Sequence, residues 1–170
     1  MAVLLNQSSS LQVRLELLRR LSDGLRAPAS LEMRVSVDCY QHRQGAEHGF
    51  VPQLLVPKAT LLDMDLIQFL QGLEELLDGK AEQAALEASV DPAIGLRLMG
   101  GPAAFQVELG VDLLNVLEPV GGMKSERGED LVLYRFVANQ RAALAFCAGL
   151  IDEFAKFPTD PSRVNPGEPG

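Results

Sequence analysis

Cysteine, basic residues and long apolar runs are all scarce in this chain of 170 residues. The two cysteines, Cys39 and Cys147, have no motif spacing and fall at apolar phases of their segments. We therefore expect small core residues in a reducing compartment, not a disulfide or a nucleophile. No apolar run approaches the roughly 18 residues that span a bilayer, and the start MAVLLNQSSS lacks the basic region of a secretory signal. These absences predict a cytoplasmic protein that does not bind membranes.

Positive charge is the second scarcity. The chain has 15 Lys and Arg residues against 23 Asp and Glu, a formal net charge of −8. Between Ala59 and Asp91 there are eight acidic residues and one base, Lys80, so this segment carries −7 of that charge. Nucleic acids are bound by clustered Lys and Arg, so the composition argues against a nucleic-acid partner. The acidic segment could steer a basic protein partner or simply keep the protein soluble, and the sequence leaves both open.

Recognisable catalytic and cofactor motifs are also lacking. No GxSxG, Walker or HExxH arrangement occurs, and neither Gly100-Gly101 nor Gly121-Gly122 follows a strand and opens a helix as a phosphate loop does. Cys39, His42 and His48 could supply metal ligands, but a tetrahedral site needs a fourth ligand and Cys39 falls on an apolar face. We therefore predict no enzyme activity, no cofactor and no metal site.

The clearest pattern that is present lies in residues 62–79. Apolar residues recur at helical spacing, which predicts one wide buried face: Leu66, Phe69, Leu70, Leu73, Leu76 and Leu77. Asp63 or Asp65 can cap the first turn, and Gly79 is a natural left-handed end. The interior Gly72 costs about 1 kcal/mol relative to alanine. It indicates either a close approach of another backbone or a glycine tolerated on a half-exposed face.

Alternation of apolar and polar residues predicts several strands. The predicted strands lie around residues 31–39, 53–56, 84–90, 94–99, 105–111 and 131–137. Residues 11–17 alternate as well, which favours a strand, although their leucines would also suit a helix. The polar residues of these strands predict a solvated outer face that includes Glu32, Arg34, Gln106 and Glu108. Residues 41–49 are predicted to form a hairpin loop and residues 118–130 a flexible loop.

A second helix is predicted from the cap Asn139 to about Lys156. Its apolar residues are Leu144, Phe146, Cys147, Leu150, Ile151 and Phe154. An offset of 77 residues aligns Phe146, Gly149 and Leu150 with Phe69, Gly72 and Leu73. One interpretation is a pair of related strand–helix units whose helices pack side by side with their glycines close together. The other is that two amphipathic helices share this pattern by chance or common constraint.

These elements predict an α+β fold. We expect a twisted, mostly antiparallel sheet of about six or seven strands with two helices packed on one face. Residues 11–157 would form a single domain, with a flexible N-terminus at 1–10 and a disordered Pro/Gly-rich tail at 158–170.

The order of elements and the motif (D)xDLxxFLxxLExLLxG resemble bacterial immunity proteins of the WapI type, which neutralise a secreted nuclease toxin, and related uncharacterised α+β domains. The resemblance covers residues 11–156 and rests on Asp65-Leu66, Phe69-Leu70, Leu73-Glu74, Leu76-Leu77 and Gly79. It implies a non-enzymatic protein-binding domain and transfers no catalytic residues.

The resemblance implies a toxin as the partner, and the acidic segment indicates that this toxin would be basic. The acidic segment then supplies the candidate partner-binding residues Asp63, Glu74, Glu75, Asp78 and Glu82. The alternative is a self-associating structural domain that uses an exposed sheet edge or face. The sequence leaves open whether the protein is a monomer or a homodimer.

Overall fold

The computed structural model describes residues 1–21, 29–41, 49–89, 94–101, 103–112 and 131–158. Within them the chain runs through four strands and a helix, and then through four strands and a helix again. The first unit comprises β1 (Ala2–Leu5), β2 (Leu11–Leu21), β3 (Ser30–Gln41), β4 (Gly49–Leu62) and α1 (Asp63–Leu77). The second comprises β5 (Gln83–Glu87), β6 (Ile94–Gly101), β7 (Ala104–Asp112), β8 (Leu131–Asn139) and α3 (Gln140–Ala155).

The strands form two sheets, so the prediction of one sheet with six or seven strands is wrong in detail, whereas the α+β class is confirmed. Each sheet has four antiparallel strands in sequence order, β1-β2-β3-β4 and β5-β6-β7-β8. The sheets meet where the Gln7 N–H, after β1, donates to the carbonyl oxygen of Val137 in β8 at 2.7 Å. Residues 11–21 are a strand, as the alternation favoured.

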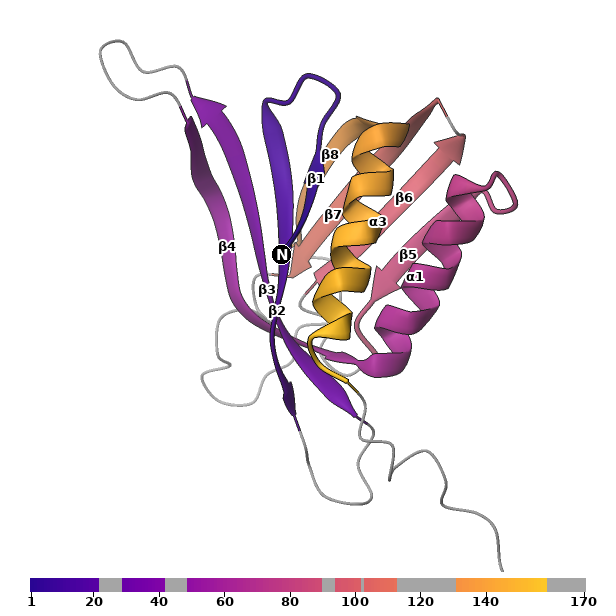
Figure 1. Cartoon of the computed structure of the whole chain (residues 1–170). Helices are drawn as coiled ribbons and strands as arrows, with labels where there is room; N and C mark the ends of the chain where they lie inside the picture. Colours follow the sequence, from indigo (N-terminus) through magenta and orange to yellow (C-terminus); the bar gives the residue numbers. More distant parts are fainter. Residues whose placement is uncertain (22–28, 42–48, 90–93, 102, 113–130, 159–170) are drawn as a thin grey trace, which may run out of the picture.

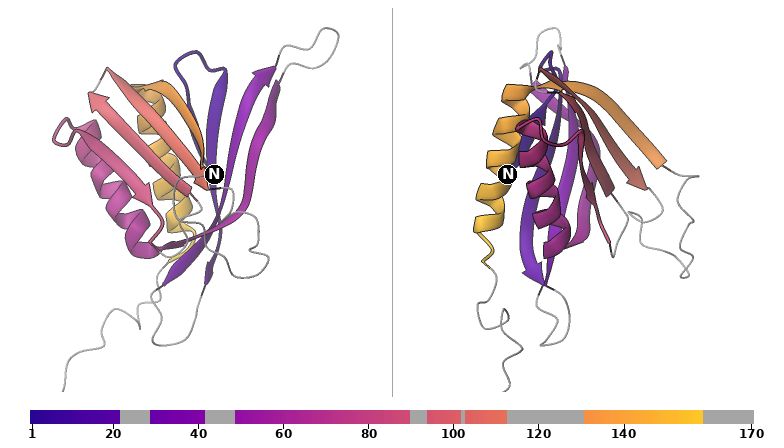
Figure 2. Two further views of the ribbon diagram at one scale, coloured as in Figure 1. Left: turned by 180° about the vertical axis from the view of Figure 1, so that it is seen from behind. Right: turned by 90° about the vertical axis from the view of Figure 1, so that its right-hand side faces the viewer.

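Both helices lie in one layer on the same side of the strands (Figures 1 and 2). They contact each other, but each packs mainly on a strand of the other unit: α1 on β5 and α3 on β1. The core is therefore shared between the two units, and its largest fully buried side chains come from both: Phe69, Phe105, Phe146, Leu15, Met33 and Leu86. Neither helix packs mainly on the strands of its own unit.

The two aligned glycines face these strands. A Cβ atom added to Gly72 would lie 3.6 Å from the Cβ of Ala84 in β5, and one added to Gly149 would lie 3.1 Å from the Cα of Ala2 in β1. The interpretation that the two glycines lie close together is therefore wrong, although the helices do contact each other. The topology does agree with two equivalent units, because each helix covers the first strand of the other unit through its glycine.

Helix α1 has the buried face and the end that its sequence predicts. Leu66, Phe69, Leu73 and Leu76 are buried, and Gly79 adopts a left-handed φ of +71°. At the start of the helix, Asp65 accepts hydrogen bonds from the backbone N–H groups of Leu62 at 3.0 Å and Ser89 at 3.1 Å.

Helix α3 begins at the predicted cap. The Asn139 side chain accepts a hydrogen bond from the Ala142 N–H at 2.8 Å, which satisfies a free amide of the first turn. Phe146, Cys147 and Leu150 are buried in the core as expected. Leu144 and Ile151 were predicted on the same apolar face, but they point to solvent and are 51% and 43% exposed.

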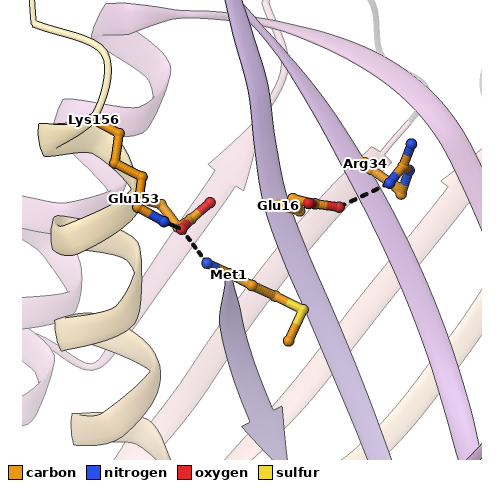
Figure 3. A network of polar contacts seen from close by, with 5 residues as sticks. All are labelled: Met1, Glu16, Arg34, Glu153 and Lys156. Carbon is orange, nitrogen blue, oxygen red and sulfur yellow. Dashed lines mark hydrogen bonds and ion pairs between the residues drawn. The ribbon is translucent and has the colours of Figure 1, made fainter.

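The first residues are ordered into a strand, unlike the flexible N-terminus predicted for 1–10. Ala2 and Leu4 are fully buried, and the Met1 amino group and Lys156 both pair with the buried carboxylate of Glu153 (Figure 3). Burial opposes ionisation of Glu153, but the hydrogen bonds and charges of these two partners outweigh it and lower its pKa. The sequence did not predict β1, because its four residues are a short apolar run without alternation.

Three predictions concern residues outside the described part of the chain: the hairpin loop with His42 and His48, the loop at 118–130, and the tail at 158–170, of which only residue 158 is described. Among the described helices, neither is long and apolar enough to cross a bilayer.

Candidate functional site

The outer face of the second sheet, opposite the helices, contains a hollow of about 340 Å³. Strands β5, β6, β7 and β8 all contribute to its lining. The lining is mostly apolar and includes Ala85, Gly95, Gly110, Leu131 and Leu133. We take this hollow as the candidate functional site.

Two neighbouring glycines form its floor. Gly95 of β6 pairs directly with Gly110 of β7, and Gly110 pairs with Leu133 of β8. Because neither glycine has a side chain, the central strands leave an open space between the residues on either side. Leu131 leans over this space: its Cδ1 atom would lie 3.3 Å from a Cβ atom added to Gly110.

The first sheet fills the corresponding place with polar side chains. When the two units are aligned through Ala2 and Ala84, the pair Gly95 and Gly110 corresponds to Gln12 and Asp38, which also pair directly across adjacent strands. There, Gln12 Nε2 donates to the fully buried Asp38 carboxylate at 2.9 Å. The hollow thus occupies a place that polar side chains fill in the first sheet, and it arises from the glycines of the second.

Paired charges border the hollow. Arg97 Nη2 lies 3.3 Å from Glu87 Oε1, and Arg135 Nε lies 2.8 Å from Glu108 Oε1. Arg97, Glu108 and Arg135 also stand opposite one another in the strand register, so charges of opposite sign alternate across three strands. The arginines remain accessible, with side chains 44% and 61% exposed.

The lining combines apolar residues with arginine and carboxylate side chains. The described lining contains no Ser, Thr, Cys, His, Lys or Tyr side chain that could serve as a nucleophile or neutral base. Of its three carboxylates, Glu87 and Glu108 are held by arginines, and Asp112 is only 6% exposed. An apolar floor with a polar, charged rim is the usual composition of a recognition pocket.

The predicted partner-binding residues lie elsewhere. Glu74, Glu75, Asp78 and Glu82 are exposed on α1 and just after it. Asp63 is separate from them: it is 7% exposed and pairs with Arg20, which binds the carbonyl oxygen of Phe157 as well. The structure therefore gives Asp63 an internal role and leaves a four-residue acidic surface, Glu74, Glu75, Asp78 and Glu82.

The acidic surface and the hollow lie on opposite faces of the second sheet. Ala84 of β5 contacts α1 at Gly72, whereas the adjacent Ala85 lines the hollow. Successive residues of a strand point to opposite faces, so the two features do not form one continuous surface.

Sequence reasoning did not find the hollow. It predicted a polar outer face from Gln106 and Glu108, and it identified the strand that contains Gly110. The missed signal is a glycine at an outward position in each of two adjacent strands, since Gly95 and Gly110 meet only once the register of β6 and β7 is known.

Neither cysteine belongs to a metal or catalytic cluster within the described residues. No group of three or more His, Cys, Asp and Glu side chains that could hold a metal ion occurs there. Burial, aided by the negative charge of Glu74, raises the pKa of the Cys147 thiol, which disfavours its thiolate.

Comparisons with known proteins add no family. The sequence matches no protein-family description, no characterised protein and no solved structure at a significant level. The resemblance to WapI-type immunity proteins therefore stays a prediction, and the candidate site rests on its own geometry.

Proposed function

We propose that this protein is a non-enzymatic binding domain that takes an apolar side chain of a protein partner into the hollow. The observation that carries the proposal is the paired glycine floor, Gly95 and Gly110, beneath the exposed Leu131 and Leu133. A volume of about 340 Å³ is at the lower end of the range for ligand pockets, roughly 300–1,000 Å³. Interfaces typically derive most of their energy from such a pocket, which an anchor side chain fills while polar groups around it exclude water.

We further propose that the partner is basic, as a toxin neutralised by an immunity protein would be. The support is the acidic surface, where Glu74, Glu75, Asp78 and Glu82 concentrate negative charge. That surface does not adjoin the hollow, so its contribution would be long-range attraction, which mainly raises the association rate and is weakened by salt.

The test fills the hollow without disturbing the core. A Cβ atom at Gly95 would have only the Leu86 carbonyl oxygen within 4 Å, at 3.9 Å, so Gly95→Val adds a residue that favours strands and occupies the binding space. The wild-type protein and this variant would each be used to capture partners from the native cell, with bound proteins identified by mass spectrometry. We expect Gly95→Val to lose the specific partner while its melting temperature stays the same or rises.

Gln106→Val is the matched control. Gln106 is exposed on the same outer face of β7 but outside the hollow lining, so this variant should retain the partner. Equal capture by wild type and Gly95→Val would show that the hollow does not bind it. With the partner identified, replacing Glu74, Glu75 and Asp78 by Lys should slow association at low salt, and an unchanged rate would refute the electrostatic part of the proposal.

A further inference from the structure

The outward side of α3 carries an apolar stripe. Leu144 and Ile151 are 51% and 43% exposed, and Ala148 and Ala155 are exposed as well. Spacings of four, three and four residues place all four on one side of the helix, and we call them the α3 stripe. The opposite side of α3 packs on β1, and α3 lies in the outer layer of the molecule (Figure 2). A helix that is apolar on both sides is typical of one that is covered on both.

Two opposite charges flank this stripe. Arg141 and Asp152 are 11 residues apart, close to three full turns, so they lie on the same flank near opposite ends of the helix. Both are exposed, and neither lies within ion-pair distance of another described residue, although the charge of Asp152 acts on Lys156 one turn away.

This arrangement is complementary to itself. When two identical helices pack antiparallel about a twofold axis, the same flank of each meets, and the start of one lies beside the end of the other. Arg141 of one copy then lies beside Asp152 of the second copy, and this pairing occurs twice. Parallel packing would instead set this flank of each helix against the opposite flank of the other copy, so Arg141 and Asp152 would not meet.

We infer that α3 is the interface of a homodimer, in which the α3 stripes of two copies pack antiparallel and the two Arg141–Asp152 pairs set the orientation. The occupant of the stripe is thus a second copy of this chain. A single helix pair is smaller than a standard protein interface, so we expect a dissociation constant on the order of 10 µM.

Sedimentation equilibrium of the full chain tests this directly. The wild type should shift from monomer to dimer between about 1 and 500 µM, bracketing the expected dissociation constant. Ala148→Arg should remain monomeric, because it brings a charged side chain against the partner's stripe. Gln71→Arg, on the exposed face of α1, is the matched control and should dimerise as the wild type does. Circular dichroism would verify that each variant is folded.

A charge exchange tests the orientation. Arg141→Asp and Asp152→Arg should each weaken the dimer about tenfold, since two ion pairs become two repulsive contacts. The double variant with both exchanges should recover most of the wild-type affinity. A wild type that stays monomeric throughout, or an Ala148→Arg variant that dimerises normally, would overturn the interface. Failure of the double variant to recover would overturn the antiparallel arrangement.

Discussion

Gly149 of α3 lies directly over Ala2 of β1, so close that a methyl group at position 149 would be 3.1 Å from the Cα and 3.3 Å from the Cβ of Ala2. The aligned glycine of the first unit, Gly72, occupies the same kind of position over Ala84, but with 3.6 Å to the nearest atom. The two aligned glycines thus differ: Gly149 is in tight contact with its strand, whereas Gly72 is at ordinary van der Waals distance.

This difference predicts opposite effects of alanine at the two sites. Gly72→Ala gains helix propensity without a clash and should raise the free energy of unfolding by up to about 1 kcal/mol. Gly149→Ala makes the same gain but forces α3 away from β1, and overpacking typically costs about 1–3 kcal/mol. Urea unfolding of both variants measures the contrast. If Gly149→Ala were as stable as Gly72→Ala, the close packing of α3 on β1 would be incorrect.

Arg20 connects the ends of both helices. Its guanidinium pairs with Asp63 at the start of α1, donates to the Phe157 carbonyl oxygen after α3, and lies 5.8 Å from the centre of the Phe154 ring. The side chains of Arg20 and Asp63 are only 16% and 10% exposed. Arg20→Ala would leave the Asp63 charge buried without a partner, so we expect a loss of about 3 kcal/mol in thermal or urea unfolding.

The control for this prediction is Arg34→Ala. Arg34 pairs with Glu16 on the outer face of the first sheet (Figure 3), and both side chains are more than 40% exposed. Removing it should cost less than about 0.5 kcal/mol. Comparable losses for the two variants would mean that the Arg20–Asp63 pair is not a buried link.

Glu32 predicts a pH dependence of stability. Hydrogen bonds from Arg19 and Lys58 lower the pKa of this buried carboxyl to about 2, despite its burial. Since the folded-state pKa lies below that of the unfolded chain, the contribution of Glu32 to stability is present above about pH 4.5 and lost as the pH falls toward 2.

Glu32→Gln should therefore destabilise the protein by about 1 kcal/mol near neutral pH, a value limited by the exposure of both partners. The difference from wild type should shrink steadily below pH 4.5. Urea unfolding at several pH values measures it. A difference that is independent of pH between 3 and 7 would contradict the assigned pairing.

A further prediction concerns the contribution of four core side chains of the two helices to stability. Phe69, Leu73, Phe146 and Leu150 are all at most 1% exposed, and truncating any one to alanine should cost about 3 kcal/mol or more. For a chain of this size, that corresponds to a fall in melting temperature of roughly 6–12 °C. Met64→Ala is the control, because Met64 is 56% exposed on α1 and its truncation should shift the melting temperature by less than about 2 °C.

The amino-acid sequence by itself determined most of the secondary structure. The 3.6-residue period and the caps located α1 and α3 to within one or two residues, and alternation located most of the strands. These signals are local, because a residue's neighbours along the chain define which face it shares. Leu144 and Ile151 show the limit of these signals. Both were predicted on the buried face, yet both are exposed, because an apolar residue on a helix is not necessarily turned to the core.

Only the tertiary structure decided which elements meet. Strand pairing joins residues far apart in sequence. The alternation of apolar and polar residues therefore indicated which face of each strand is buried, but not that the strands divide into two sheets. The same non-local contacts placed α1 and α3 on each other's units, enclosed Asp63 beside Arg20, and brought Gly95 next to Gly110. The hollow and the α3 stripe also depend on these contacts. Which residues remain on the surface is decided by which ones the neighbouring strands and helices cover.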